Sequence, residues 1–337
     1  MKHTMPAARR LERAIPSTAE QAAWAAQLAH VPEPASRYAQ CAGYEIHFMD
    51  WAPAAEGASP RPARPVVIAW HGLARTGRDM DPLARYLAAL GYRVICPDTL
   101  GRGLSQWSHA PGEEYQLRFY ARLACELLDA LALEQVHWVG TSMGGAIGMV
   151  CASGLFEPTL APRICSLVLN DNAPELAQPA LERIKGYAGQ PPAFASIAEL
   201  EAFFRNAYAP YGWLPDTQWR ALTESSTRRL PDGRVTPHYD PAMIQQFTRH
   251  ENDYGLWPHY DALQLPVLLL RGEASDLVLR ATAEQMQQRG PGARGLLQWI
   301  EVAGCGHAPA LNVMAQWQAV AAALQAGEAA AQGLKGA

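Results

Sequence analysis

Gly140, Ser142 and Gly144 form the pattern Gly-x-Ser-x-Gly, the feature that most constrains what this chain can fold into. The apolar run 136–139 precedes the pattern, and the small, helix-compatible run 146–152 follows it. This order of strand, sharp turn and helix is the context of a nucleophile elbow, in which a strained turn exposes a serine. Glycine suits the flanking positions because it has no Cβ to clash with the turn. Taken alone, the pattern also fits a Ser-Gly loop without chemistry.

Two side chains downstream of Ser142 complete the chemistry that a serine nucleophile needs. Acyl transfer requires a base to take the hydroxyl proton and a carboxylate to orient that base. The strand pattern 266–272 leads into Asp276, and the strand pattern 296–302 leads into His307. Successive strands of an open α/β sheet place their carboxyl ends at one edge, where such sites lie. We therefore predict a triad of Ser142, Asp276 and His307.

Asp171 is a rival for the role of the acid because it also follows a strand pattern, 163–171. Asp276 lies in the turn 272–278, immediately before the strand that carries His307, so we expect these two loops to be neighbours. Asp171 instead opens the next segment, where capping a helix or pinning a hinge is a simpler task. We therefore expect Asp276 to orient His307.

Motifs upstream of the elbow add a resemblance to a known family. The strand pattern 65–70 ends in His71-Gly72, and residues 98–105 read Asp-Thr-Leu-Gly-Arg-Gly-Leu-Ser. Together with the elbow and His307, these motifs make residues 42–325 similar to the α/β-hydrolase fold superfamily, and to its Ser-His-Asp esterases and lactonases with a helical cap.

The resemblance implies an oxyanion hole made of two backbone N–H groups. They belong to the residue after His-Gly and the residue after the nucleophile, which are Leu73 and Met143 here. We expect His71 itself to be a buried structural histidine that shapes the loop. The serine nucleophile disfavours the haloalkane dehalogenase and epoxide hydrolase branches, which the resemblance associates with aspartate.

The periodicity predicts an α/β fold with a mostly parallel central sheet flanked by helices, because strand patterns alternate with helical ones. Ser17 can cap a helix over 18–30. The predicted units are a helical leader (1–40), a core (41–171 and 261–327), a helical cap (172–260) and a frayed tail (328–337).

The predicted cap lacks any convincing strand pattern, and it is rich in aromatic residues. Of the 29 aromatic residues of the chain, 13 lie in 172–260, which favours a pocket lined by rings. Phe203, Phe204 and Trp213 are the candidates for contact with substrate. The alternative is that these rings form the core of the cap itself.

The composition indicates which classes of binding partner are not expected. The net charge of -4, without a basic tract interleaved with aromatics, gives no sign of nucleic-acid binding. No apolar run is long enough to span a membrane, and no apolar stretch follows Arg9, Arg10 and Arg13 as in a secretory signal. The six cysteines have no metal-binding spacing and suggest free thiols in a reducing cytoplasm. We expect neither a metal nor an organic cofactor, and the oligomeric state stays open.

These features predict a hydrolase that cleaves a carboxylic ester or lactone of a small apolar or aromatic molecule through an acyl-enzyme. The same machinery also serves hydrolases that cleave carbon–carbon bonds in ring-fission products. A third possibility is a ligand receptor built on a hydrolase fold. Turnover of model esters separates the three.

Overall fold

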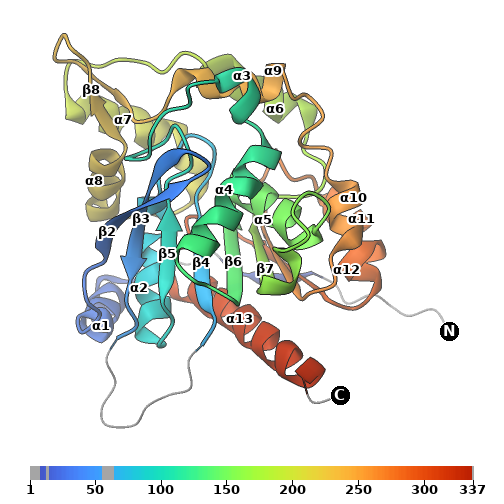
Figure 1. Cartoon of the computed structure of the whole chain (residues 1–337). Coiled ribbons are helices and arrows are strands. Elements are labelled where there is room, and N and C mark those ends of the chain that lie inside the picture. Colours follow the sequence, from blue (N-terminus) through green and yellow to red (C-terminus); the bar gives the residue numbers. More distant parts are fainter. Residues whose placement is uncertain (1–7, 13–14, 55–63, 336–337) are drawn as a thin grey trace.

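A computed structural model describes residues 8–12, 15–54 and 64–335 of the chain (Figure 1). Within them, one nine-stranded sheet runs in the order β1-β11-β10-β7-β6-β4-β5-β3-β2. Its strands are β1 (Arg9–Leu11), β2 (Ala35–Cys41), β3 (Tyr44–Trp51), β4 (Val66–Trp70), β5 (Val94–Pro97), β6 (Val136–Thr141), β7 (Ile164–Asn170), β10 (Val267–Gly272) and β11 (Leu297–Val302).

The sheet is parallel from β1 to β5, and only β3 and β2 are antiparallel to their neighbours. This confirms the predicted α/β fold with a mostly parallel central sheet. The parallel arrangement brings the carboxyl ends of β4, β6, β7, β10 and β11 to one edge, where the predicted site residues lie.

Helices cover both faces of the sheet. The flanking helices are α2 (Asp81–Ala89), α4 (Leu117–Ala130), α5 (Met143–Ser153), α11 (Arg280–Gln288), α12 (Gly290–Ala293) and α13 (Met314–Lys335), and the short α3 (Pro111–Glu114) precedes α4. Side chains alternate along β4: Ile68 and Trp70 join one apolar core with α4 and α5, while Val67 and Ala69 join the other with α2 and α13. Both faces of β4 are therefore buried, as expected for a central parallel strand.

The first forty residues contribute more than the helix expected there. Helix α1 (Thr18–Leu28) begins as predicted at Ser17, whose hydroxyl accepts from the Glu20 N–H while the Glu20 carboxylate accepts from the Ser17 N–H. The same segment also supplies β1 and most of β2, which the sequence pattern did not predict. These strands lie at opposite edges of the sheet.

The segment between β7 and β10 is mostly helical. It contains α6 (Gln178–Ala188), α7 (Ile197–Ala207), α8 (Asp216–Ser225), α9 (Gln245–Thr248) and α10 (Trp257–Ala262), with short 3-10 turns between them. The expectation of no strand there is wrong, because β8 (Thr227–Arg229) and β9 (Val235–Pro237) form an antiparallel hairpin. Gly233 lies in the turn between the two strands and has φ of +87°. Glycine adopts this conformation without strain, which explains the Asp-Gly sequence of the turn.

The tail predicted to fray at 328–337 is helical in the structure up to Lys335. Alanine has the highest intrinsic helix propensity, and this Ala-rich end extends α13. Glu328 also lies 3.8 Å from both Arg64 Nη1 and His137 Nε2, so this turn of the helix is attached to the core. Residues 336–337 lie outside the described residues.

Candidate active site

Ser142 occupies the sharp turn between β6 and α5. Its backbone has φ of 51° and ψ of -117°, a conformation that a residue other than glycine adopts only when its surroundings enforce it. A Cβ at Gly140 would lie 2.2 Å from the Gly144 carbonyl carbon, and a Cβ at Gly144 would lie 2.3 Å from the Trp70 carbonyl oxygen. Both glycines are therefore required by close backbone packing, as the elbow pattern predicts.

Asn170, at the end of β7, ties the elbow to the loop that carries His307. The Ser142 N–H donates to the Asn170 carbonyl over 2.9 Å. The Asn170 side-chain amide donates to Thr141 Oγ1 at 3.0 Å and to the Pro309 carbonyl at 2.8 Å. One buried side chain thus holds the residue before the nucleophile and the His307 loop together. Nothing in the sequence pattern singled out Asn170 for this role.

The carboxylate that contacts His307 is Asp171, which corrects the prediction of Asp276. His307 Nδ1 lies 2.7 Å from Asp171 Oδ2. Asp171 is fully buried, and it also accepts from the Gly272 N–H at 2.8 Å and from Ser275 Oγ at 2.6 Å. Asp276 is half exposed and pairs with Arg183 of α6. The pKa of Asp276 is lowered mainly by Arg183, and only to a smaller extent by His307.

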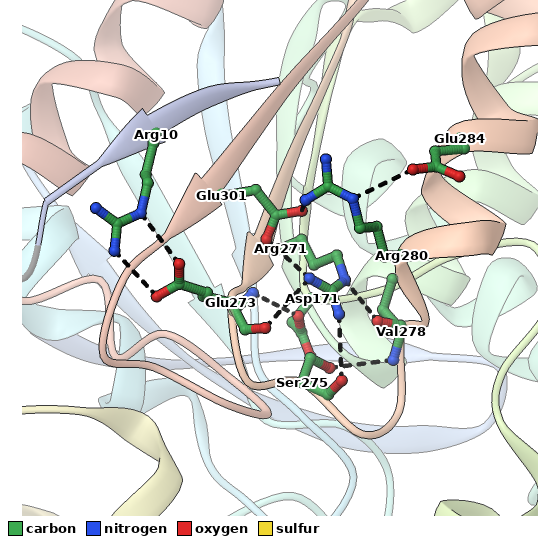
Figure 2. Close-up of polar contacts among 10 residues, drawn as sticks. Arg10, Asp171, Arg271, Glu273, Ser275, Val278, Arg280, Glu284 and Glu301 are labelled. Carbon is green, nitrogen blue, oxygen red and sulfur yellow. Dashed lines mark hydrogen bonds and ion pairs between the residues drawn. The ribbon is translucent and has the colours of Figure 1, made fainter. Parts of the chain in front are cut away.

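The turn after β10 wraps around Arg271 and donates to Asp171 through Ser275 (Figure 2). Arg271 is buried inside this turn, where its guanidinium donates to the carbonyls of Val278 at 2.7 Å and Ser275 at 3.3 Å, and to Glu301 at 2.8 Å. The Ser275 hydroxyl then points at Asp171 and accepts from the Val278 N–H at 3.1 Å. Wrapped in this way, the turn presents Ser275 inward and Asp276 outward.

His71 is the buried structural histidine that the sequence suggested. Its Nδ1–H donates to the Gly72 carbonyl at 2.6 Å, and its Nε2 accepts from the Thr99 N–H at 2.9 Å. Burial lowers the pKa of His71 to about 4, so the ring is neutral in ordinary buffers. The histidine therefore holds the loop after β4 against the loop after β5.

The loop after β4 brings Leu73 to the nucleophile. A Cβ built on Gly72 would lie 3.7 Å from Ser142 Cβ, so the two loops touch. Met143 is the first residue of α5, where the backbone N–H has no partner within the helix. Among the described residues, neither the Leu73 N–H nor the Met143 N–H donates a hydrogen bond. Both N–H groups are thus unpaired among the described residues, and their role as an oxyanion hole stays a prediction.

A cavity of about 670 Å³ opens beside the elbow. We call it the elbow cavity. Its lining residues do not include Ser142 or His307; they include α2 and the turn before it, with Arg78, Met80 and Arg85, and three further groups. The elbow side includes Gly72, Thr141, Ala308 and Pro309; the cap side includes Trp213, Leu214, Gln218 and Leu222; and the N-terminal side includes Thr18, Gln21, Ala22 and Ala25.

Of the three aromatic candidates of the cap, one lines a cavity and two pack in or against the core of the cap. Trp213 lines the elbow cavity. Phe204 is fully buried in a small core of the cap with Leu200 and Val235, and Phe203 packs against that core. Neither Phe203 nor Phe204 is among the residues that line the elbow cavity, which favours the interpretation that these two rings belong to the core of the cap. Sequence alone did not separate them because all three rings lie in the same aromatic-rich segment.

The cap meets the histidine loop directly. Pro210, in the 3-10 turn after α7, accepts at its carbonyl from the Gly306 N–H at 2.7 Å. Tyr211, in the same turn, accepts from the Ala310 N–H at 3.2 Å. Asn312 donates from its side chain to the Trp213 carbonyl at 2.8 Å and to Gln218 Oε1 at 2.7 Å. The position of the cap is thus set by the same loop that carries His307.

Comparison with protein families agrees with this geometry. Residues 65–312 match the family described as alpha/beta hydrolase fold. The chain belongs to that family. This α/β-hydrolase is 37% identical over 273 residues to the 3-hydroxybutyrate-oligomer hydrolase of Cupriavidus necator, an alignment that covers 78% of this chain and 88% of the relative.

Two further comparisons concern a second relative of this α/β-hydrolase and a solved structure. The 2-hydroxymuconate semialdehyde hydrolase of a Pseudomonas species is 35% identical over 118 residues, 34% of this chain and 38% of the relative. Among solved structures, an alpha/beta hydrolase from Novosphingobium aromaticivorans superposes with a TM-score of 0.72 at 31% identity, covering 87% of this chain and 98% of that one.

Two further properties bear on this hydrolase. In the part of the chain that the structure describes, no helix combines the length and the apolar character that crossing a bilayer requires. Within that same part, no three His, Cys, Asp or Glu side chains gather as metal ligands would.

Proposed function

We propose that this hydrolase cleaves carboxylic esters through an acyl-enzyme, with Ser142 as nucleophile, His307 as base and Asp171 as the orienting acid. The observation that carries the proposal is the contact between buried Asp171 and His307, 2.7 Å apart, tied through Asn170 to a strained serine turn. The two free N–H groups beside Ser142 and the elbow cavity supply the remaining parts.

Each step follows from these positions. Ser142 Oγ attacks the ester carbonyl carbon while His307 Nε2 takes its proton, and Asp171 fixes the tautomer that leaves Nε2 free to accept. The Leu73 and Met143 N–H groups bind the oxyanion, and one such donor lowers the barrier by roughly 3 kcal/mol. His307 then protonates the departing alkoxide. Water, deprotonated by His307, attacks the acyl-enzyme and releases the acid.

We further propose that the natural substrate is a short linear ester of hydroxyalkanoic acids. The support is the relative that hydrolyses 3-hydroxybutyrate oligomers, which matches 78% of the chain. The elbow cavity agrees, since its walls are mostly apolar and its volume of about 670 Å³ can hold more than one hydroxyacid unit. Lactones of the same acids present the same carbonyl to Ser142.

The proposal is tested by following hydrolysis of the linear dimer and trimer of 3-hydroxybutyrate by chromatography. We expect the trimer to yield free hydroxyacid, and Ser142→Ala to abolish the reaction while the folded spectrum is kept. A serine-directed phosphonate should add once per chain, at Ser142. Labelling elsewhere, or unchanged activity in Ser142→Ala, contradicts the triad.

A second candidate is hydrolysis of a carbon–carbon bond in ring-fission products. Relatives with this activity match short segments of the chain, such as 43% identity over 74 residues with a hydrolase of Paraburkholderia xenovorans named for 2-hydroxy-6-oxononadienedioate. Rapid turnover of 2-hydroxymuconate semialdehyde without turnover of any ester would favour this reaction. Tight binding of 2-hydroxymuconate semialdehyde or of an ester, without turnover, would favour a ligand receptor.

A further inference from the structure

Helix α1 forms one wall of the elbow cavity, although it lies outside the residues that match the family. Thr18, Gln21, Ala22 and Ala25 line the cavity from α1, opposite α8 of the cap. Figure 1 places α1 and α8 on the same side of the molecule, near α2. The elbow cavity therefore extends from Gly72 and Thr141, which flank the elbow, to a wall formed by a cap helix and an N-terminal helix.

Aromatic contacts fix α1 in this position. The Trp24 ring packs edge-on against Trp317 of α13, with ring centroids 5.5 Å apart, and Trp317 stacks on Tyr86 of α2 at 5.3 Å. Leu28, at the end of α1, is buried in the same core. Ala22 and Ala25 remain exposed and line the cavity, so two small side chains keep it open next to an anchored tryptophan.

The chemistry of these walls suits an extended chain of esters. Such a chain is apolar between its carbonyls and offers acceptors at regular intervals. The walls supply apolar surface from Ala25, Trp213 and Leu222. Gln218 accepts from Asn312 through Oε1, and its amide N–H has no acceptor among the described residues. The charged side chains that line the cavity, Arg78 and Arg85 among them, are paired with carboxylates.

We propose that α1 is the outer wall of a subsite for the part of a linear oligoester that extends from the scissile bond at Ser142, and that α1 thereby sets the length of chain accepted. This inference rests on the proposed ester hydrolysis.

The test is a pair of substitutions one residue apart on α1. Ala25→Trp fills the cavity, whereas Ala26→Trp adds the same ring on an exposed position that does not line it. We expect Ala25→Trp to lower kcat/KM for the hydroxybutyrate trimer by roughly tenfold or more, as a steric block in a pocket does, and to leave p-nitrophenyl acetate turnover nearly unchanged. Ala26→Trp should leave both values as in the unmodified protein.

Binding separates failure of this inference from failure of the proposed reaction. In the Ser142→Ala background, the trimer should bind more tightly than the monomer by calorimetry, and Ala25→Trp should remove that difference. Equal effects of Ala25→Trp and Ala26→Trp overturn the role of α1. If the unmodified protein hydrolyses no ester while Ala25→Trp still weakens trimer binding, the reaction is wrong and the subsite stands.

A second, independent observation concerns Arg102, which contacts both residues of the oxyanion hole. Its Nε donates to the Leu73 carbonyl at 2.9 Å, and its Nη2 lies 3.7 Å from Met143 Sδ. Nη1 donates to the Leu100 carbonyl at 2.7 Å and to the Tyr120 hydroxyl at 2.9 Å. The side chain is fully buried.

The guanidinium of Arg102 is a buried charge without a carboxylate partner among the described residues. Its neighbours are the rings of Tyr115 and Tyr120, with centroids 5.4 and 5.5 Å from Cζ. A fixed positive charge stabilises negative charge that develops nearby, and the effect is larger where water is excluded. The oxyanion is where negative charge develops in ester hydrolysis.

The geometry points to Arg102 as a positioning residue for the oxyanion hole: it holds the backbone at Leu73 and the side chain of Met143, and its charge favours the oxyanion. This inference also rests on the proposed reaction. Arg102→Lys keeps a charge but loses the fork of donors, and Arg102→Met loses both.

The measurements are kcat, KM and the infrared stretch of the acyl-enzyme carbonyl. We expect Arg102→Lys to lower kcat by roughly tenfold to a hundredfold with little change in KM, as loss of transition-state stabilisation does. The carbonyl stretch should move to higher frequency, because a weaker oxyanion hole polarises the carbonyl less. An unchanged stretch overturns the proposal, even if activity falls.

Two milder variants keep the test meaningful if Arg102 variants fold poorly. Met143→Leu removes the sulfur contact, and Tyr120→Phe removes one hydroxyl partner while leaving the contacts to the oxyanion hole intact. Met143→Leu should shift the carbonyl stretch in the same direction as Arg102→Lys, and Tyr120→Phe should shift it less. Identical stretches in both variants and the unmodified protein contradict the role of Arg102.

Discussion

Asp171 gathers three hydrogen-bond partners on one carboxylate, which satisfies its oxygens in a site without water contact. The Gly272 N–H, the Ser275 hydroxyl and His307 all point at it. A buried carboxylate is costly unless its oxygens are satisfied in this way. Asp276, by contrast, faces solvent and an exposed arginine, where an ion pair contributes little.

Paired asparagine substitutions test the assignment of the acid. Asp171→Asn should lower kcat by about 10⁴-fold, the loss that follows when the orienting carboxylate of a serine protease is replaced. The physical reason is that an amide can donate to His307 Nδ1 and so favour the wrong tautomer. Asp276→Asn should change kcat only a few fold. Steady-state kinetics on one ester with both variants checks the ranking, and the opposite ranking returns the role to Asp276.

Ser142 and His307 could be predicted from the sequence because their constraints are local. Gly140 and Gly144 are required by the tight backbone packing around Ser142, and His307 lies in the loop that follows β11. The acid could not be predicted in the same way. Its identity depends on how the turn after β10 wraps around Arg271, a residue that reads as part of an apolar strand.

At the scale of elements, the helices and strands with strong periodicity were predictable, and the short or edge elements were not. Helix α1 begins where its capping box indicates, and β4, β6 and β10 follow buried apolar runs. β2 carries exposed side chains along most of its length, so it lacks an apolar pattern. The hairpin of β8 and β9 has only three residues in each strand, too few for a period to show.

Two aromatic residues of the cap should respond to truncation in opposite ways. Phe204→Ala should lower the free energy of unfolding by roughly 3–5 kcal/mol, because it empties a buried site in the core of the cap. Trp213→Ala should change the chain-length preference among ester substrates with a smaller change in stability, because Trp213 lines the elbow cavity. Urea unfolding and ester kinetics on both variants check this, and a swap of the two effects would show that the cap packs differently.

At the scale of the whole molecule, burial of neutral His71 couples stability to pH. Its folded pKa of about 4 lies below the ordinary histidine pKa of 6.5, so between these values the unfolded chain binds a proton that the folded protein does not. The stabilisation is present above the unfolded pKa and is lost as pH falls toward the folded one. Between about pH 7 and pH 5 the loss amounts to about 2 kcal/mol.

His71→Gln removes this titration while keeping one donor and one acceptor for Gly72 and Thr99. The variant should therefore lose less stability than the unmodified protein when pH is lowered over that range, even if it is less stable at neutral pH. The lowered pKa values of partly buried His238 and buried His259 act equally in both proteins. Urea titrations at pH 7 and pH 5 measure the free energy of unfolding of both proteins. Equal losses of stability in the two proteins would mean that His71 does not cause the pH dependence.

The pairing of β1 with β11 has a consequence for the order in which the molecule is completed. Arg9 lies opposite Ile300, so the first described strand pairs with the last one. A ribosome adds roughly 5–20 residues each second, so tens of seconds pass between the synthesis of these two partners. During that interval β1 has no edge to join, and α1, which follows it, lacks both this tether and Trp317. The wall of the cavity is thus assembled late, from a segment that is made well before the partners that hold it.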